Sequence, residues 1–155
     1  MINKQIVIVM FLLFSIIACY DDTYDDMTQA NFTLSILTKD SFGQVNDTFL
    51  QGEPITIEMM VSNPTSKKID LKFSSGCQYS FKLYNSNNEA VWDWLADKLC
   101  TQAITYLTIP ANGSELIIVE QDGTINPDSR PVGDYKLTGY LIGYDRIAEM
   151  TITIQ

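Results

Sequence analysis

The sequence predicts an all-β fold, an antiparallel immunoglobulin-like β-sandwich of about eight strands. Three observations lead to this prediction. Short segments alternate apolar with polar residues, as strands with one buried face do. Turn-forming residues separate these segments at short intervals. No segment repeats its apolar residues with the 3.6-residue period of a helix.

The clearest alternation is in residues 55–61, where Ile, Ile, Met and Val occupy every second position. The segment Asn63-Pro64-Thr65 ends this run, because proline interrupts strand pairing. Gly139 lies inside a later strand and predicts a β-bulge there. Further strands are expected at residues 32–37, 69–73, 104–109, 116–119, 135–142 and 150–154.

A β-hairpin is expected where two aromatic-rich strands, residues 79–83 and 90–94, flank the polar turn 85–89. Tyr79 and Phe81 share one strand face, and so do Trp92 and Trp94, because side chains alternate with a period of two. One interpretation places these aromatic residues in the core as cross-strand neighbours. In the alternative, Trp92 and Trp94 form an exposed platform for a sugar or a peptide.

The N-terminus has the composition of a signal peptide over residues 1–18. Lys4 precedes an apolar run from Ile6 to Ala18, whose 13 residues would rise only about 20 Å as a helix. A hydrocarbon core is ~30 Å thick, so we expect a cleaved signal and not a spanning helix. The ending Ile16-Ile17-Ala18-Cys19 resembles a bacterial lipobox, in which Cys19 is acylated. The alternative is an ordinary signal peptide with an incidental cysteine.

Lipidation at Cys19 predicts a protein of the bacterial cell envelope, periplasmic or surface-exposed, held to the membrane through its lipid alone. The segment 19–30 is then an acidic tether, and residues 31–155 form one domain. Calcium binding by the four aspartates of the tether is a second possibility, although these residues lack the glycine-turned loop of alternating ligands. They are Asp21, Asp22, Asp25 and Asp26.

Charge and composition exclude several classes of function. Without residues 1–18 the chain has 9 Lys and Arg against 19 Asp and Glu, which argues against nucleic acid as a partner. The absence of histidine excludes Ser-His-Asp and Cys-His catalysis and His-ligated metals. The sequence has no phosphate-binding loop or nucleotide fingerprint, and its carboxylate pairs occur in no recognisable catalytic context. We therefore expect no enzyme, no cofactor and no metal centre.

The block from Phe73 to Ala103 resembles the BsuPI-type intracellular proteinase inhibitor domain, a small all-β bacterial family. With flanking matches at Asn63-Pro64-Thr65 and at residues 110–113, the resemblance covers roughly residues 53–120. Its other matching elements are Phe73, Ser75-Gly76, Tyr79-x-Phe81, Val91-Trp92-x-Trp94, Asp97-Lys98 and Thr101-Gln102-Ala103.

The resemblance implies a proteinase inhibitor or protease-binding module, with a serine protease as partner. Such inhibitors present a rigid loop that loses little entropy on docking. Because the family is intracellular and this chain carries an export signal, a second hypothesis remains. In that hypothesis the domain is a non-enzymatic envelope module that binds a protein or glycan, since sandwiches host many functions.

Two cysteines remain once Cys19 is lipidated, and an exported pair usually forms a disulfide. Both Cys77 and Cys100 depart from the family pattern, which has a polar and an aromatic residue at these positions, so their pairing is the simplest account. Both lie on expected loops, and their bridge would not be the inter-sheet disulfide of antibody domains.

The bridge would brace residues 95–102 as an interaction loop, in which Leu95 or Leu99 fills an apolar pocket of the partner. In the alternative, this run is a structural crossover between the sheets and its leucines seal the core. The other residues assigned to the interaction loop are Asp97, Lys98, Thr101 and Gln102.

Overall fold

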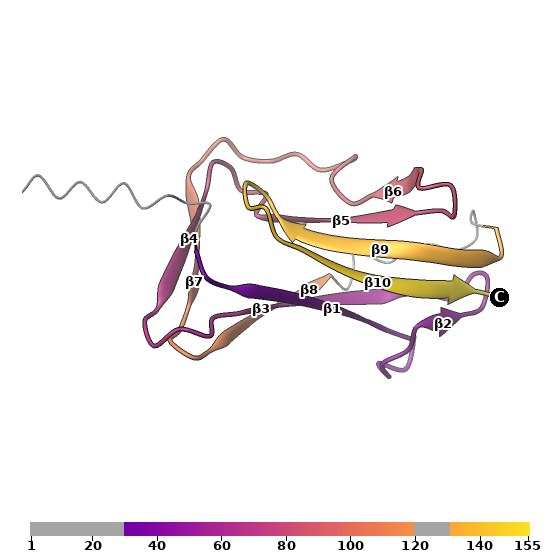
Figure 1. Ribbon diagram of the computed structural model, residues 1–155. Coiled ribbons are helices and arrows are strands. Elements are labelled where there is room, and N and C mark those ends of the chain that lie inside the picture. Colours follow the sequence, from indigo (N-terminus) through magenta and orange to yellow (C-terminus); the bar gives the residue numbers. More distant parts are fainter. Residues whose placement is uncertain (1–29, 120–130) are drawn as a thin grey trace, which may run out of the picture.

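The computed structural model describes residues 30–119 and 131–155, which contain ten strands and no helix (Figure 1). The all-β prediction is confirmed. The strand that the sequence did not predict is β2, which has only two residues. The strands are β1 (Thr33–Lys39), β2 (Thr48–Phe49), β3 (Thr56–Ser62), β4 (Ile69–Phe73), β5 (Tyr79–Tyr84), β6 (Ala90–Asp93), β7 (Thr105–Ile109), β8 (Ser114–Val119), β9 (Gly133–Leu141) and β10 (Ile147–Ile154).

The strands form two larger sheets and one small one. One larger sheet has the order β1-β3-β8, and the other has the order β2-β10-β9-β5-β6. Pairing is antiparallel throughout, except between β10 and β2. The small sheet, β4-β7, lies crosswise at one end of the molecule (Figure 1). Strand β1 begins near this same end, and β2 and the C-terminus lie at the opposite end (Figure 1).

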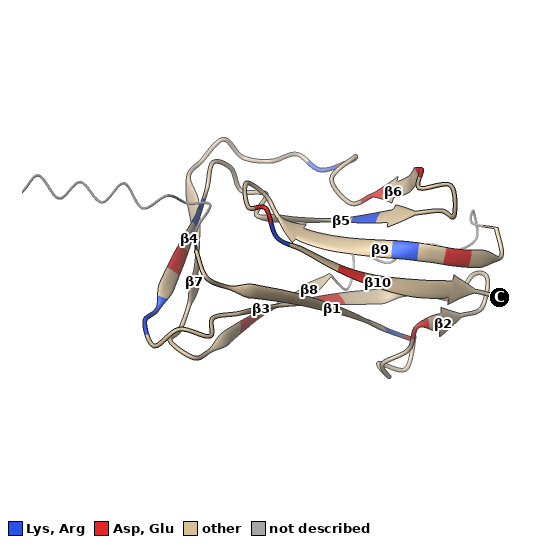
Figure 2. Ribbon diagram, in the orientation of Figure 1, with Lys and Arg blue, Asp and Glu red and all other residues tan. Residues whose placement is uncertain are grey.

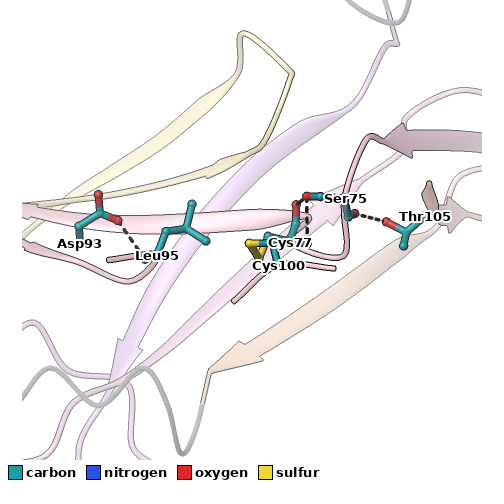
Figure 3. The surroundings of a disulfide bond; sticks show 6 residues. All are labelled: Ser75, Cys77, Asp93, Leu95, Cys100 and Thr105. Carbon is teal, nitrogen blue, oxygen red and sulfur yellow. Dashed lines mark hydrogen bonds between the residues drawn. A yellow bond between two sulfur atoms is a disulfide. The ribbon is translucent and has the colours of Figure 1, made fainter. Parts of the chain in front are cut away.

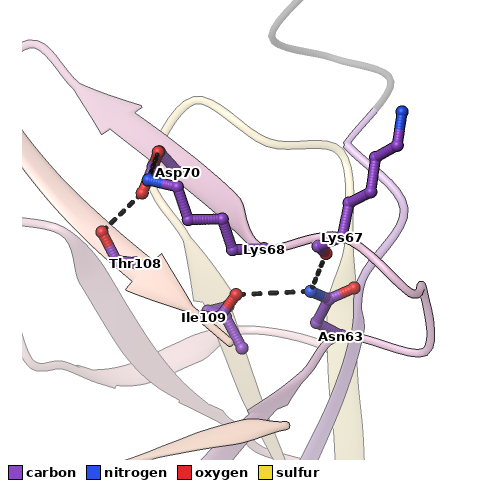
Figure 4. Close-up of polar contacts among 6 residues, drawn as sticks. All are labelled: Asn63, Lys67, Lys68, Asp70, Thr108 and Ile109. Atoms are coloured by element: carbon purple, nitrogen blue, oxygen red, sulfur yellow. Dashed lines mark hydrogen bonds and ion pairs between the residues drawn. The ribbon is translucent and has the colours of Figure 1, made fainter. Parts of the chain in front are cut away.

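Strands β3 and β4 pair with β8 and β7 as one ribbon that bends at a corner. The buried amide of Asn63 holds this corner (Figure 4). Its Nδ2 donates to the carbonyl oxygens of Lys67 at 2.7 Å, Pro110 at 2.9 Å and Ile109 at 3.3 Å. Its Oδ1 accepts from the backbone N–H and the hydroxyl of Thr65. The Asn63 side chain therefore forms hydrogen bonds with backbone groups that have no partner strand where the ribbon bends.

The core lies between the inner faces of the two larger sheets. In β3, Ile57, Met59 and Val61 are fully buried, as the alternation predicts. Within the part of the chain that the structure describes, the buried core residues fall between Phe32 and Ile154. The buried members of the core are Phe32, Phe49, Ile55, Ile57, Met59, Val61, Leu71, Phe73, Phe81, Leu83, Ile109, Val119, Tyr135, Leu137, Leu141, Tyr144, Ile152 and Ile154.

The expected bulge at Gly139 is wrong. Gly139 pairs in regular register with Phe81 on one side and Ala148 on the other. A Cβ at this position would lie 2.9 Å from atoms of both Ile36 and Phe81. Glycine is required here because side chains from the facing sheet and the adjacent strand fill the space above its backbone. The register shift lies instead in β5, between Leu83 and Tyr84.

Tyr144, in the turn between β9 and β10, connects the small sheet to the sandwich. Its ring packs edge-on against Phe32 and Phe73, with centroids 5.5 and 5.6 Å away. Its hydroxyl accepts a 2.9 Å hydrogen bond from the Lys72 N–H and donates to the Lys72 carbonyl. The hydroxyl thus pairs the backbone groups of Lys72 at the edge of β4.

Charged residues of both signs are spread over the strands and the loops (Figure 2). Among the described residues, ion pairs between neighbouring strands are Lys39–Glu58, Lys82–Asp93 and Lys136–Glu149, and Lys68–Asp70 is a local pair at the start of β4. In the same residues, no helix has the length and hydropathy needed to cross a bilayer. The expected signal peptide, the lipidated Cys19 and the acidic tether with its four aspartates lie outside the described residues.

Candidate interaction loop

The connections β4–β5 and β6–β7 are joined by a disulfide between Cys77 and Cys100 (Figure 3). The Cα atoms of the two cysteines are 5.3 Å apart, within the range that a disulfide requires. Both cysteines lie on loops, as the sequence predicts. In the chain-entropy model, a bridge that closes a loop of this length contributes about 3 kcal/mol.

Backbone contacts reinforce this covalent link. The Gly76 N–H donates a 2.9 Å hydrogen bond to the Thr101 carbonyl, next to the disulfide. A Cβ at Gly76 would overlap the Thr101 hydroxyl, so a larger residue here would force the Thr101 side chain to rotate away. The Thr105 hydroxyl donates to the Ser75 carbonyl at 2.7 Å, and Gln78 Nε2 donates to the Thr105 hydroxyl at 3.1 Å. The C-terminal side of the β6–β7 loop is therefore held at several points.

The N-terminal side of the same loop is folded into consecutive turns. The Ala96 N–H donates to the Asp93 carbonyl, and the Lys98 N–H donates to the Leu95 carbonyl. Asp93 Oδ1 accepts from the Leu95 N–H at 3.0 Å (Figure 3), while Oδ2 pairs with the Lys82 ammonium at 3.0 Å. The hydrogen bond to Asp93 raises the pKa of Lys82, and its partial burial opposes that rise. This carboxylate thus connects the start of the loop to β5.

The Trp94 ring packs between Tyr79 of β5 and Lys98 of the loop. Its ring centroid lies 4.9 Å from that of Tyr79, and the Lys98 ammonium lies 4.9 Å above the Trp94 ring. Lys98 is half-buried and is engaged by this cation–π contact. Phe81 is fully buried, and Tyr79, Trp92 and Trp94 are half-buried against the core. The two tryptophans therefore pack inward and do not form an exposed aromatic platform.

Leu99 extends from this braced loop into solvent, with its side chain fully exposed. The alternative in which both leucines seal the core is wrong for Leu99, and Leu95 is only half-buried. Asp97, Thr101 and Gln102 are also exposed. Of the six residues assigned to this loop, Leu99 is thus the one large apolar side chain that is wholly available to a partner.

Two residues that fix the geometry of this loop, Gly76 and Asp93, were not predicted from the sequence to contact it. In the sequence, Gly76 stands out only as a match to the family, and Asp93 lies on the strand face opposite to that of Trp92 and Trp94, so neither predicts a contact with this loop. A glycine next to a cysteine, and an aspartate two residues before a loop leucine, were the available signals. Each contact joins segments that only the folded chain brings together.

The described residues contain no cluster of three or more His, Cys, Asp or Glu side chains able to hold a metal ion. The aspartates considered for calcium fall outside these residues and are not part of that finding. The disulfide and the hydrogen-bonded loop provide shape and rigidity, and Leu99 provides apolar surface. This arrangement is suited to binding by an exposed loop.

Comparison with known families gives one match that spans most of the domain. The family described as BsuPI, intracellular proteinase inhibitor, matches residues 44–145. No curated protein matches the chain.

Two solved structures are similar in part. The first is the alkylpurine DNA glycosylase AlkC of Pseudomonas fluorescens bound to DNA containing an abasic site analog. It has a TM-score of 0.46 and 10% identity, over 81% of this chain and 31% of that chain. The second is a β-glucosidase involved in saponin metabolism from intestinal bacteria, with a TM-score of 0.40 and 10% identity, over 82% of this chain and 16% of that chain. The chain thus spans less than a third of either protein.

Proposed function

Because this chain belongs to the BsuPI family of intracellular proteinase inhibitors, whose model covers residues 44–145, we propose that it inhibits a serine protease through its β6–β7 loop. The observation that carries the proposal is the full exposure of Leu99 beside the Cys77–Cys100 disulfide. In this mechanism Leu99 enters the specificity pocket of the protease. The remainder of the loop occupies the cleft next to the catalytic groups.

Rigidity makes such a loop an inhibitor and not a substrate. The loop is held at one end by the disulfide and the Gly76–Thr101 hydrogen bond, and at the other end by Asp93. Little conformational entropy is then lost on docking, and the bond beside Leu99 cannot move freely into a reactive geometry. Burial of the leucine side chain contributes about 1.5–3 kcal/mol of binding free energy.

The side chains flanking Leu99 favour a protease with an apolar specificity pocket. The neighbouring cation, Lys98, is engaged with the Trp94 ring and would have to leave it to enter an acidic pocket. Leu99 needs no such rearrangement, since it is already in solvent. Subtilisin-like proteases therefore fit the loop better than trypsin-like proteases.

A lipid anchor on Cys19 would place this activity in the cell envelope. With Cys19 acylated, the acidic segment that follows it would tether the domain to the membrane. The inhibitor would then act on proteases that reach the membrane surface, a location different from that in the family's name. This difference supports the second candidate function, a non-inhibitory envelope module that uses the same loop to bind another envelope protein.

Titration of subtilisin, chymotrypsin and trypsin with residues 20–155 tests the proposal. We expect inhibition of subtilisin, weakened roughly 10- to 100-fold by Leu99→Ala. Ile147→Ala is the matched control, because Ile147 is also a mostly exposed aliphatic residue but lies on β10. Absence of inhibition of all three enzymes at micromolar protein would favour the second function. If subtilisin is inhibited equally well by wild type and by Leu99→Ala, the protein is an inhibitor but the β6–β7 loop is not its binding site.

A further inference from the structure

The outer face of the β1-β3-β8 sheet carries several apolar side chains around Glu58, whose carboxylate is paired with the Lys39 ammonium. Strand register places Leu116 opposite Met60, and it places Ile118 and Leu37 on either side of Glu58. These residues alternate with the buried ones, so they point away from the core. Met60, Leu116 and Ile118 are 40%, 47% and 43% exposed, and Leu37 is half-buried. We call Leu37, Met60, Leu116 and Ile118 the outer patch.

Strand β8 is also an edge strand, paired only with β3 in the part of the chain that the structure describes. The Asn63 N–H donates a 2.9 Å hydrogen bond to the Gly113 carbonyl, which sets the direction of the backbone groups that follow. Because these groups alternate along an antiparallel strand, those of Ser114, Leu116 and Ile118 point to the outer edge. At β4, by contrast, the Tyr144 hydroxyl pairs with the edge groups of Lys72.

We propose that β8 pairs antiparallel with β8 of a second copy of this chain, joining the two three-stranded sheets into one. The register places Ile117 opposite Ile117 of the second copy, on the two-fold axis. Leu116 then lies opposite Ile118 of the second copy, and their backbone groups exchange hydrogen bonds. The two outer patches meet on one face and form a larger apolar surface.

The charge of the strand favours a second copy as the occupant. Glu115 is the only charged residue of β8, and this register places it opposite Val119 of the second copy and not opposite another Glu115. Edge strands that remain solitary usually carry lysine or proline to prevent pairing, and β8 carries neither. The strand is thus self-complementary in both its hydrogen-bonding groups and its side chains.

The first experiment measures oligomeric state by sedimentation velocity of residues 20–155, from low micromolar to submillimolar concentration. We expect a dimer that Ile118→Lys converts to a monomer. The new lysine lies opposite Glu58 in the cross-strand pair, so the fold is retained while the edge becomes charged. Ile147→Lys, at a 61% exposed position on β10, should remain a dimer. A monomeric wild type, or a dimer that persists in Ile118→Lys, would reject the proposal.

The second experiment tests the register. Directly opposed residues in a non-hydrogen-bonded antiparallel pair have Cα atoms about 4.5 Å apart, which suits a disulfide. Ile117→Cys should therefore form a covalent dimer on oxidation, seen on a non-reducing gel. Ser114→Cys is the control, because this register separates its two copies along the strands. Cross-linking of Ser114→Cys as readily as Ile117→Cys would contradict the register.

Discussion

The Tyr144 hydroxyl bonds to both backbone groups of Lys72, accepting from the N–H at 2.9 Å and donating to the carbonyl at 3.3 Å. The two residues are 72 positions apart in the chain, so this contact joins the β9–β10 turn to the edge of the small sheet. A single phenol thus substitutes for a neighbouring strand at this point of β4.

Tyr144→Phe should lower the free energy of unfolding by about 1–3 kcal/mol, because it leaves a half-buried backbone N–H without its acceptor.

Burial also raises the pKa of Tyr144 above its ordinary value of 10.0, with the Lys72 hydrogen bond opposing part of the rise. The unfolded chain therefore ionises first, and the advantage of wild type over the variant should shrink above pH 10. Urea denaturation at several pH values measures both effects, and Tyr140→Phe, on the outer sheet face, is the control.

Asn63→Ala should cost roughly 3 kcal/mol of stability, because several buried carbonyl oxygens lose their donor at the ribbon corner. Asn85→Ala is the control, since the Asn85 amide makes comparable hydrogen bonds in the exposed hairpin loop, where water replaces them. We expect the control to change stability by less than about 1 kcal/mol. Equal losses in the two variants would contradict the role given to the Asn63 amide.

Replacement of Cys77 and Cys100 with serine should lower stability by about 3 kcal/mol without changing the fold, because the core strands do not depend on the link. If the proposed function is right, the variant should also be cleaved between Leu95 and Thr101 by a protease that wild type inhibits. Mass spectrometry of the digest locates the cut. Free thiols at both positions in exported wild-type protein would refute the bridge.

The pKa of Asp70 should lie below its ordinary value of 3.8, because the Lys68 ammonium and the Thr108 hydroxyl bond to the carboxylate (Figure 4). Lys68→Gln should raise this pKa more than Thr108→Val does, in the order of the two causes. The ionised carboxylate stabilises the fold above pH 3.8, and its contribution is lost as the pH falls through the folded pKa. The chemical shift of the Asp70 carboxyl carbon in an NMR titration measures this pKa. A wild-type pKa at or above 3.8 would contradict the two hydrogen bonds to the carboxylate.

Cys19→Ser should abolish acylation of the chain, because the serine hydroxyl does not replace the thiol in lipidation. The N-terminal peptide of the protein recovered from membranes reports this by mass. Wild type should carry a diacylglyceryl group on Cys19, while Cys77→Ser, which leaves the lipobox intact, should keep it. An unmodified Cys19 in the wild-type peptide would remove the anchor from the proposal.

Local patterns predicted most of the strands because alternation records which face of each strand is buried. Residues 69–73 were predicted with their observed bounds, and the hairpin of β5 and β6 has the expected loop at residues 85–89. Strand β2 was missed because two residues cannot show a period. The bulge predicted at Gly139 was wrong because a glycine in a strand also occurs where neighbouring side chains approach the backbone, here those of Ile36 and Phe81.

The candidate loop was predicted in its position but not in its geometry. The number of cysteines and the expected export signal predicted the Cys77–Cys100 pair from the sequence alone. The exposure of Leu99 was not predictable, because a leucine in a loop without periodicity fits a buried crossover equally well. Only the paths of β6 and β7 and the turn at Leu95–Lys98 place that side chain in solvent.

The disulfide closes a ring that contains the whole β5–β6 hairpin and the Leu99–Cys100 peptide bond. A single cut at that bond opens the ring, yet it releases no fragment, since Cys77 still holds Cys100. The two new ends stay close together, because Gly76 and Asp93 hold the segments on either side. If the proposed function is right, a protease that cleaves the loop once keeps both halves of its product in the cleft, and religation competes with release.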